Sequence, residues 1–115
     1  MRIGITIVIT FFLFLVLLDS CMQFRMSRTE VANYFKDVPV RTEQLSYRLG
    51  NRVINYVIAG DDHLPLVVFV HGSPGSLSAF IHFLKDDTLL KYVQMITVDR
   101  PGFGASNFGH AEPSL

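Results

Sequence analysis

The spacing of hydrophobic positions changes several times along this chain, and each spacing indicates a different kind of element. Residues 3–18 are apolar apart from two threonines and a glycine, and only Arg2 carries a charge before them. A charged start followed by an apolar stretch is the layout of a secretory signal. We therefore exclude this leader from the folded domain that follows it.

A short helix is predicted soon after the leader. Ser27 and Glu30 have the spacing of a capping box, in which each side chain accepts a hydrogen bond from the backbone of the other residue. Val31, Tyr34 and Phe35 then lie three and four residues apart, which places them on one apolar stripe of the helix.

Three strands are expected next, from runs rich in β-branched, aliphatic and aromatic residues. Residues 44–49 and 52–58 flank Gly50 and Asn51, a pair suited to a tight turn, so these two runs predict an antiparallel hairpin. Residues 66–70 are apolar without alternation, the pattern of a strand buried on both faces.

A parallel strand–helix–strand unit is predicted from the next segment. An apolar stripe predicts an amphipathic helix after strand 66–70, and a further strand is expected over 92–98. Residues 105–115 show no periodicity. The four positions of the stripe are Leu77, Phe80, Ile81 and Leu84.

The end of the leader resembles the lipobox of bacterial lipoproteins. An aliphatic residue, Leu18, stands three positions before Cys21, and the small Ser20 directly precedes it, although Asp19 departs from the usual pattern. The resemblance implies cleavage and lipidation at Cys21, which would make this a bacterial lipoprotein of the cell envelope. A plain cleaved signal and a retained anchor stay open, because an apolar helix over 3–18 is roughly 24 Å long, against about 30 Å for the hydrocarbon core.

Composition narrows the possible partners. Lys+Arg and Asp+Glu both number 10, and no basic run is present, which argues against a nucleic-acid partner. The single cysteine excludes an internal disulfide and any multi-cysteine metal site. Neither glycine-containing loop continues into a phosphate-binding motif. We expect no cofactor and no metal.

Two loops follow the predicted parallel strands, where α/β proteins bind ligands. The first reads HGSPG from His71 to Gly75, and the second reads DRPGFGAS from Asp99 to Ser106. These linked motifs resemble the HGxPG and DxPGxGxS motifs of the α/β-hydrolase superfamily, and the resemblance covers residues 45–106.

The resemblance implies a role for each loop position. The backbone N–H of Ser73 would donate to the oxyanion of a tetrahedral intermediate. His71 would hold the loop by hydrogen bonds, and Asp99 would accept loop N–H groups. The other motif positions with a structural role are Gly72, Pro74, Gly75, Pro101, Gly102 and Gly104.

No nucleophile is expected within these 115 residues. The superfamily carries it on a G-x-S-x-G elbow after a further strand, and Ser106 lacks the closing glycine. The remaining histidines are expected at the surface: His63, His82 and His110.

The expected fold is therefore a partial α/β-hydrolase fold with an incomplete sheet, organised as leader 1–21, helix and linker 22–43, and hydrolase part 44–115. The expected function is that of the N-terminal part of a membrane-targeted hydrolase, inactive alone, whose whole protein cleaves an ester, amide or related bond in a small molecule or peptide. Epoxide-hydrolase and dehalogenase relatives also fit the motif. The alternative is a non-enzymatic, membrane-tethered binding domain on the same fold.

The incomplete sheet also predicts self-association. In this fold, strand 66–70 lies between strand 92–98 and a fifth strand, which these residues do not supply. Its apolar edge would be open, which favours pairing with another chain.

Overall fold

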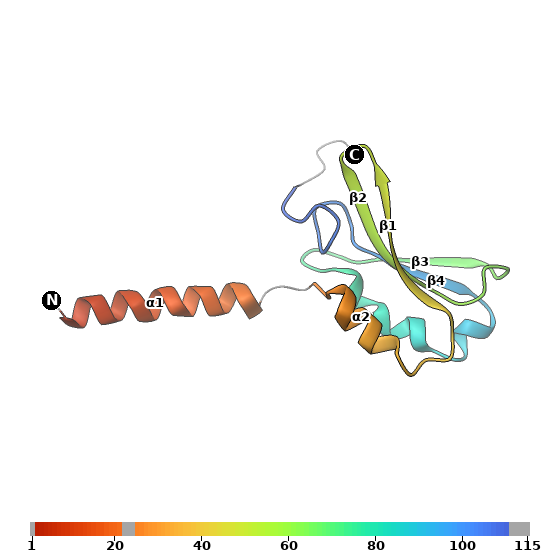
Figure 1. Ribbon diagram of the computed structural model, residues 1–115, viewed down its shortest axis with the longest axis horizontal. Coiled ribbons are helices and arrows are strands. Elements are labelled where there is room, and N and C mark those ends of the chain that lie inside the picture. Colours follow the sequence, from red (N-terminus) through yellow and green to blue (C-terminus); the bar gives the residue numbers. More distant parts are fainter. Residues whose placement is uncertain (1, 22–24, 111–115) are drawn as a thin grey trace.

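The computed structural model describes residues 2–21 and 25–110, which form an isolated helix and a mixed sheet with helical segments on one face (Figure 1). The predicted tail beyond residue 110 lies outside the described residues, as does the link at residues 22–24.

The leader forms helix α1, Arg2–Cys21, which extends away from the sheet in Figure 1. Its apolar side chains from Ile5 to Leu18 are exposed. Among the described residues, no helix has the length and apolarity needed to cross a membrane. Cys21 is the last residue of α1, and its lipidation stays a prediction.

The predicted capping box is present at the start of helix α2, Arg28–Phe35. The Ser27 amide donates to Glu30 Oε2 at 2.6 Å, and the Glu30 amide donates to Ser27 Oγ at 3.2 Å. The first of these bonds lowers the pKa of Glu30, because it stabilises the ionised carboxylate. Val31 and Phe35 are buried, which confirms the predicted apolar stripe.

Four strands form one sheet, in the order β1-β2-β4-β3. The predicted hairpin is confirmed: Gly50, with a φ of 59°, lies in the turn between the two antiparallel strands β1 and β2. Strands β3 and β4 are parallel, and β4 pairs antiparallel with β2. The bounds are Thr42–Leu49 for β1, Arg52–Ala59 for β2, Leu66–Val70 for β3 and Gln94–Val98 for β4.

One face of this sheet is covered and the other is open. Val57 and Met95 point from β2 and β4 into a core closed by α2 and by the segment after β3. The remaining core residues are Val31, Phe35, Ala59, Leu77, Ile81 and Leu84.

The prediction that β3 is buried on both faces is wrong. Val67 and Phe69 pack against the core, but Leu66, Val68 and Val70 are 53%, 50% and 58% exposed. An unbroken apolar run carries no information about how many faces a given stretch of chain covers, and the described residues cover only one.

The predicted amphipathic helix after β3 is also replaced, by two 3₁₀ segments, η1 (Leu77–Ala79) and η2 (Ile81–Lys85). The predicted stripe still packs inward, with Leu77, Ile81 and Leu84 buried. The Leu77 carbonyl accepts two hydrogen bonds. The bond from the Phe80 amide, at 3.3 Å, closes a tight turn, and the bond from the Thr97 hydroxyl, at 2.9 Å, attaches this turn to β4. We attribute the loss of the α-helix to this anchoring.

Strand β4 begins two residues later than predicted. The Tyr92 and Val93 amides both donate to the Leu89 carbonyl, at 2.9 and 3.0 Å, and so close the 3₁₀ segment η3, Leu89–Lys91. These two amides are therefore used in a turn and not in the sheet.

Candidate functional site

Asp99, the first residue after β4, joins the two motif loops. Its buried carboxylate accepts hydrogen bonds from the Leu77 amide at 2.7 Å and the Ala105 amide at 2.9 Å. One carboxylate thus binds the segment that follows the first motif and the end of the second motif. The arrangement holds both loops at the carboxyl ends of the parallel strands.

Asn55 in β2 completes this buried polar cluster. Its side-chain amide donates to Asp99 Oδ2 at 2.8 Å, and its side-chain oxygen accepts from Gln44 at 3.1 Å. Its backbone amide donates to Ser106 Oγ at 2.7 Å. Ser106 is fully buried and its hydroxyl oxygen is engaged by this amide, which argues against a role as nucleophile.

Both ring nitrogens of His71 contact the backbone. The Arg100 amide donates to Nε2 at 3.1 Å, so that nitrogen is unprotonated. Nδ1 then carries the hydrogen and donates to the Gly72 carbonyl at 2.6 Å. The neutral ring therefore bridges the two loops, and neither nitrogen is available to a substrate in this arrangement.

Ser73 lies at the exposed turn of the first loop, and the peptide bond between Ser73 and Pro74 is cis. Within the described part of the chain, no hydrogen bond uses the Ser73 amide. Gly75 is packed closely, since a Cβ there would lie 3.0 Å from the Gly72 carbonyl oxygen. The loop thus presents an unused donor, and its role toward an oxyanion stays a prediction.

The second loop is shaped by its glycines. Gly104 has a φ of 53°, and a Cβ there would lie 2.2 Å from the Asp99 carboxylate. Gly102 has a φ of 85°, and its amide donates to the Ser106 carbonyl at 2.7 Å. Pro101 is exposed at the turn. Glycine at position 104 is therefore required for the Asp99 contacts.

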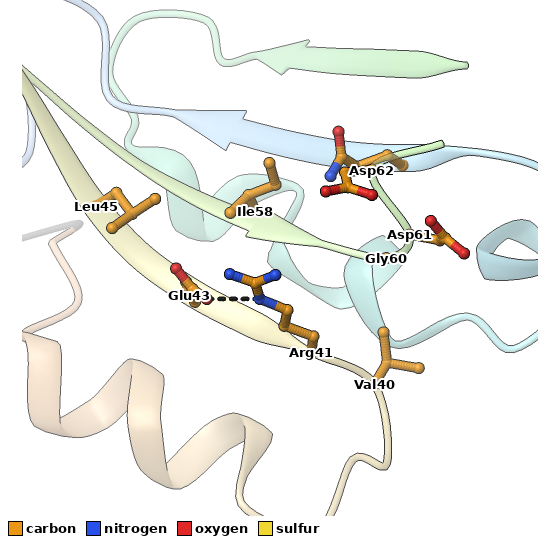
Figure 2. Close-up of a pocket in the computed structure, with 9 residues that line it drawn as sticks. Val40, Arg41, Glu43, Leu45, Ile58, Gly60, Asp61 and Asp62 are labelled. Atoms are coloured by element: carbon orange, nitrogen blue, oxygen red, sulfur yellow. Dashed lines mark hydrogen bonds and ion pairs between the residues drawn. The ribbon is translucent and has the colours of Figure 1, made fainter. Parts of the chain in front are cut away.

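A cavity of about 520 Å³ lies at the opposite end of the sheet (Figure 2). It is lined by Gly60 and Gln94, at the carboxyl end of β2 and the start of β4, and by the ion pair of Arg41 with Glu43 at 2.7 Å. Because the motif loops follow Val70 and Val98 at the other end of the parallel strands, the cavity is separate from those loops.

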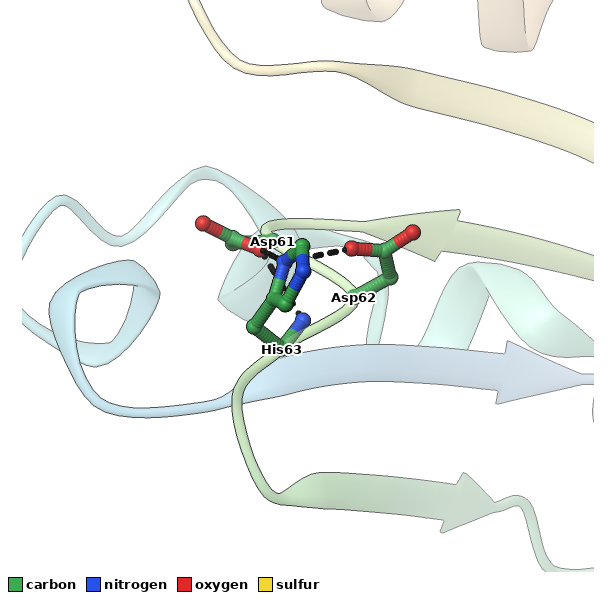
Figure 3. A network of polar contacts seen from close by, with 3 residues as sticks. All are labelled: Asp61, Asp62 and His63. Atoms are coloured by element: carbon green, nitrogen blue, oxygen red, sulfur yellow. Dashed lines mark hydrogen bonds and ion pairs between the residues drawn. The ribbon is translucent and has the colours of Figure 1, made fainter.

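A polar cluster of three exposed residues borders that cavity (Figure 3). His63 Nδ1 lies 2.8 Å from carboxylate oxygens of both Asp61 and Asp62. The hydrogen bond with Asp61, followed by the charge of Asp62, raises the pKa of His63. Oxygen and nitrogen ligands are close enough here for a metal ion, but all three side chains are solvated, and we assign no function to the cluster.

Solved structures share this arrangement of strands and loops. The haloalkane dehalogenase DatA from Agrobacterium tumefaciens C58 is 25% identical, with a TM-score of 0.52 over 64% of this chain and 24% of that protein. A membrane phospholipase A, described as a bacterial virulence factor, is 20% identical, with a TM-score of 0.55 over 90% of this chain and 33% of that protein. A candidate lipase from Acinetobacter baumannii AYE is 19% identical, with a TM-score of 0.55 over 78% of this chain and 28% of that protein.

This chain has the N-terminal part of an α/β-hydrolase fold. It spans about a quarter to a third of the length of these solved structures. No protein-family model matches the sequence, and no curated protein matches it. The α/β-hydrolase fold is thus established by the shared structure together with the motif loops.

Sequence reasoning missed Asn55 and Asn107, which connect this part of the α/β-hydrolase fold to its hairpin. Asn107 Oδ1 accepts from the Val53 amide at 2.6 Å, and its Nδ2 donates to the Asn51 carbonyl at 3.1 Å. An asparagine inside a β-branched strand was the available signal for Asn55, since a buried amide needs partners. Asn107 lies in a segment without periodicity and offered no comparable signal.

Proposed function

We propose that this chain is the N-terminal part of a membrane-targeted α/β hydrolase, in which the Ser73 amide stabilises the oxyanion of an ester, amide or related substrate. The nucleophile, the acid and the catalytic histidine come from residues outside this chain. The chain alone is inactive under this proposal.

The observation that supports the proposal best is the way Asp99 and His71 fix the first loop. Both side chains are buried and bonded to backbone groups of the two loops, which leaves the Ser73 amide on a supported turn at the carboxyl ends of the two parallel strands. Preorganised donors of this kind are effective because they need not reorient as charge develops.

Membrane targeting is proposed from the leader. The exposed apolar side chains of α1, from Ile5 to Leu18, need a nonaqueous environment, and after cleavage of the leader a lipidated Cys21 would take over the attachment. One structural relative is a membrane phospholipase, which agrees with an envelope location. Metabolic labelling with a radioactive fatty acid tests the lipidation, and Cys21→Ser is expected to abolish incorporation.

The decisive test of the enzyme proposal begins with the gene beyond codon 115. A strand followed by an elbow with serine or aspartate as nucleophile, and then a distant histidine, is expected. A downstream sequence without an elbow would favour the non-enzymatic binding domain instead.

The role of Ser73 is then tested in the longer gene product. Ser73→Pro removes the backbone donor and is expected to lower kcat by about 10²–10³-fold, whereas Ser73→Ala keeps the donor and leaves kcat nearly unchanged. Thermal melts of both variants separate a lost donor from a lost fold. Equal activity of the proline variant and the parent, with both folded, contradicts the assignment.

A further inference from the structure

The arginines of the folded domain are distributed unevenly between the two ends of the sheet. We define the arginine end as Arg25, Arg28, Arg48 and Arg100. These residues come from separate parts of the chain, so the sequence contains no basic run that would have indicated them. The fold brings them to the end of the sheet that carries the motif loops.

Contacts place the arginines from the start of the domain at this end. The guanidinium of Arg25 lies 5.9 Å from the ring centroid of Phe108, and Arg28 donates to Ser46 Oγ at 3.1 Å. Ser46 pairs with Asn55, whose amide binds the second motif loop. The start of the domain is therefore adjacent to that loop.

The other arginines flank the hairpin turn and the second loop. Arg48 pairs with Val53, beside the turn between β1 and β2. The amide of Arg100 binds His71 at the carboxyl end of β3.

Few described carboxylates oppose this charge. Asp99 is buried among backbone donors, and Glu30 is bonded to the Ser27 amide. The opposite end of the sheet carries both signs, and the ion pairs of Arg41 with Glu43 and of His63 with its two aspartates both lie there.

Apolar side chains are exposed among the arginines. Phe108 is 64% exposed and Leu49 at the hairpin turn is 62% exposed. Cations interspersed with exposed apolar groups suit the interface of a bilayer, where arginine binds phosphate groups and the apolar groups enter the acyl boundary. The apolar leader leaves the domain from the same end, because the domain begins at Arg25.

We infer that the arginine end is a docking surface for a bilayer containing anionic phospholipid, and that it holds the motif loops against the membrane. The inference rests on the proposed membrane attachment and goes beyond it, because it assigns an orientation and a lipid class to the folded domain. It is independent of the proposed catalytic role of Ser73.

The test uses the whole chain with Phe108→Trp, since the protein has no tryptophan. The variant is reconstituted into vesicles of phosphatidylcholine, alone or mixed with phosphatidylglycerol, that contain brominated acyl chains. Bromine quenches tryptophan that enters the acyl boundary. Strong quenching is expected in the phosphatidylglycerol vesicles, with little quenching in phosphatidylcholine alone or at high salt.

A matched pair of double variants tests the charges. Arg28→Gln with Arg48→Gln is expected to lower the docked-to-undocked ratio by about fivefold per arginine. Lys36→Gln with Lys91→Gln makes the same charge change away from the arginine end and is expected to leave quenching unchanged. Circular dichroism melts confirm that all variants are folded.

Flotation on a density gradient distinguishes membrane attachment of the chain from docking of the arginine end. A chain that does not float with vesicles overturns both attachment and docking. A chain that floats, but whose tryptophan signal is the same in both lipid mixtures or responds equally to the two double variants, overturns docking alone.

Discussion

At the scale of single residues, Gly104 is the position at which backbone conformation and buried charge depend on each other most closely. Its positive φ is one that side chains rarely adopt, and the space a side chain would need is filled by the Asp99 carboxylate. Any residue larger than glycine must therefore displace the group that binds both loops.

We expect Gly104→Ala to lower the free energy of unfolding by about 4 kcal/mol or more, since it adds a clash with a buried carboxylate to the cost of a left-handed alanine. Gly109→Ala is the matched control, because Gly109 also has a positive φ, of 79°, but a Cβ there would meet no atom within 4 Å beyond its chain neighbours. The control should cost only about 1–2 kcal/mol. Urea denaturation measures both, and equal losses would show that Asp99 does not occupy this space.

His63 provides a prediction about pH. Its pKa is raised, chiefly by the hydrogen bond with Asp61, so its ring should titrate above the unperturbed value of about 6.5. The ion pair is fully formed below the unfolded pKa and is lost as the pH rises through the folded pKa. Because all partners are exposed, we expect no measurable change in the free energy of unfolding from this ion pair. The titration of His63 itself is measurable by NMR of the ring protons.

Asp61→Asn should move the pKa of His63 back toward about 6.5. Asp86→Asn changes a carboxylate that accepts the Thr88 and Leu89 amides and should leave the His63 titration unchanged. An unshifted His63 in the parent protein would contradict the contact with Asp61.

At the scale of elements, the sequence predicted correctly those features that depend on contacts between residues close together in the chain. The capping box of Ser27 and Glu30, and the turn at Gly50, involve residues within a few positions of each other, and both were predicted from the sequence. The helix predicted near Leu77 was replaced because the deciding hydrogen bonds come from Thr97 and Asp99, at the end of β4. Periodicity identifies which side chains point inward, but it cannot detect partners that lie far along the chain.

Strand β3 carries a prediction about association. It lies at the edge of the sheet and contains no charge or proline, whereas the opposite edge strand, β1, contains Glu43 and Arg48. An uncharged apolar edge offers unpaired backbone groups to a second chain, and a central lysine opposes such pairing. Val68 is half exposed at the middle of β3.

We expect the parent chain to self-associate in mild detergent and Val68→Lys to shift it to the monomer in sedimentation velocity. Tyr47→Lys is the control, since it removes an exposed apolar residue from the edge strand that is already charged. If both lysine variants shift the chain equally, general apolar contact and not pairing along β3 drives the association.

At the scale of the whole molecule, the described chain presents a sheet with only one face covered. Strand register places Val68 beside Ile96, and Ile96 beside Ile58, on the open face. Leu45 and Tyr56, which pair across the hairpin, lie in the adjacent row on the same face. Such a face is typical of a sheet that packs against a further layer, which agrees with the small share of the hydrolase structures that this chain spans.

The same comparison explains which parts of the site could be predicted. The HGxPG and DxPGxGxS motifs identified the loops, because each motif is contiguous in the chain. In the buried cluster, Asn55 of β2 binds Asp99 and Ser106, which follow it by 44 and 51 positions in the chain. These contacts could be recognised only in the folded structure. The open face could not be inferred from strand patterns, because those patterns specify which side chains are apolar and not what covers them.

The open face predicts binding of a hydrophobic dye. Anilinonaphthalene sulfonate reports accessible apolar surface, so the folded chain should enhance its fluorescence without any loss of secondary structure. Leu45→Gln combined with Val68→Gln should reduce this fluorescence severalfold and leave the melting temperature nearly unchanged, because both side chains already contact solvent. Val57→Gln, which places an amide in the covered core, should instead lower the melting temperature sharply. Dye binding that survives the first double variant would place the accessible apolar surface on α1 and not on the sheet.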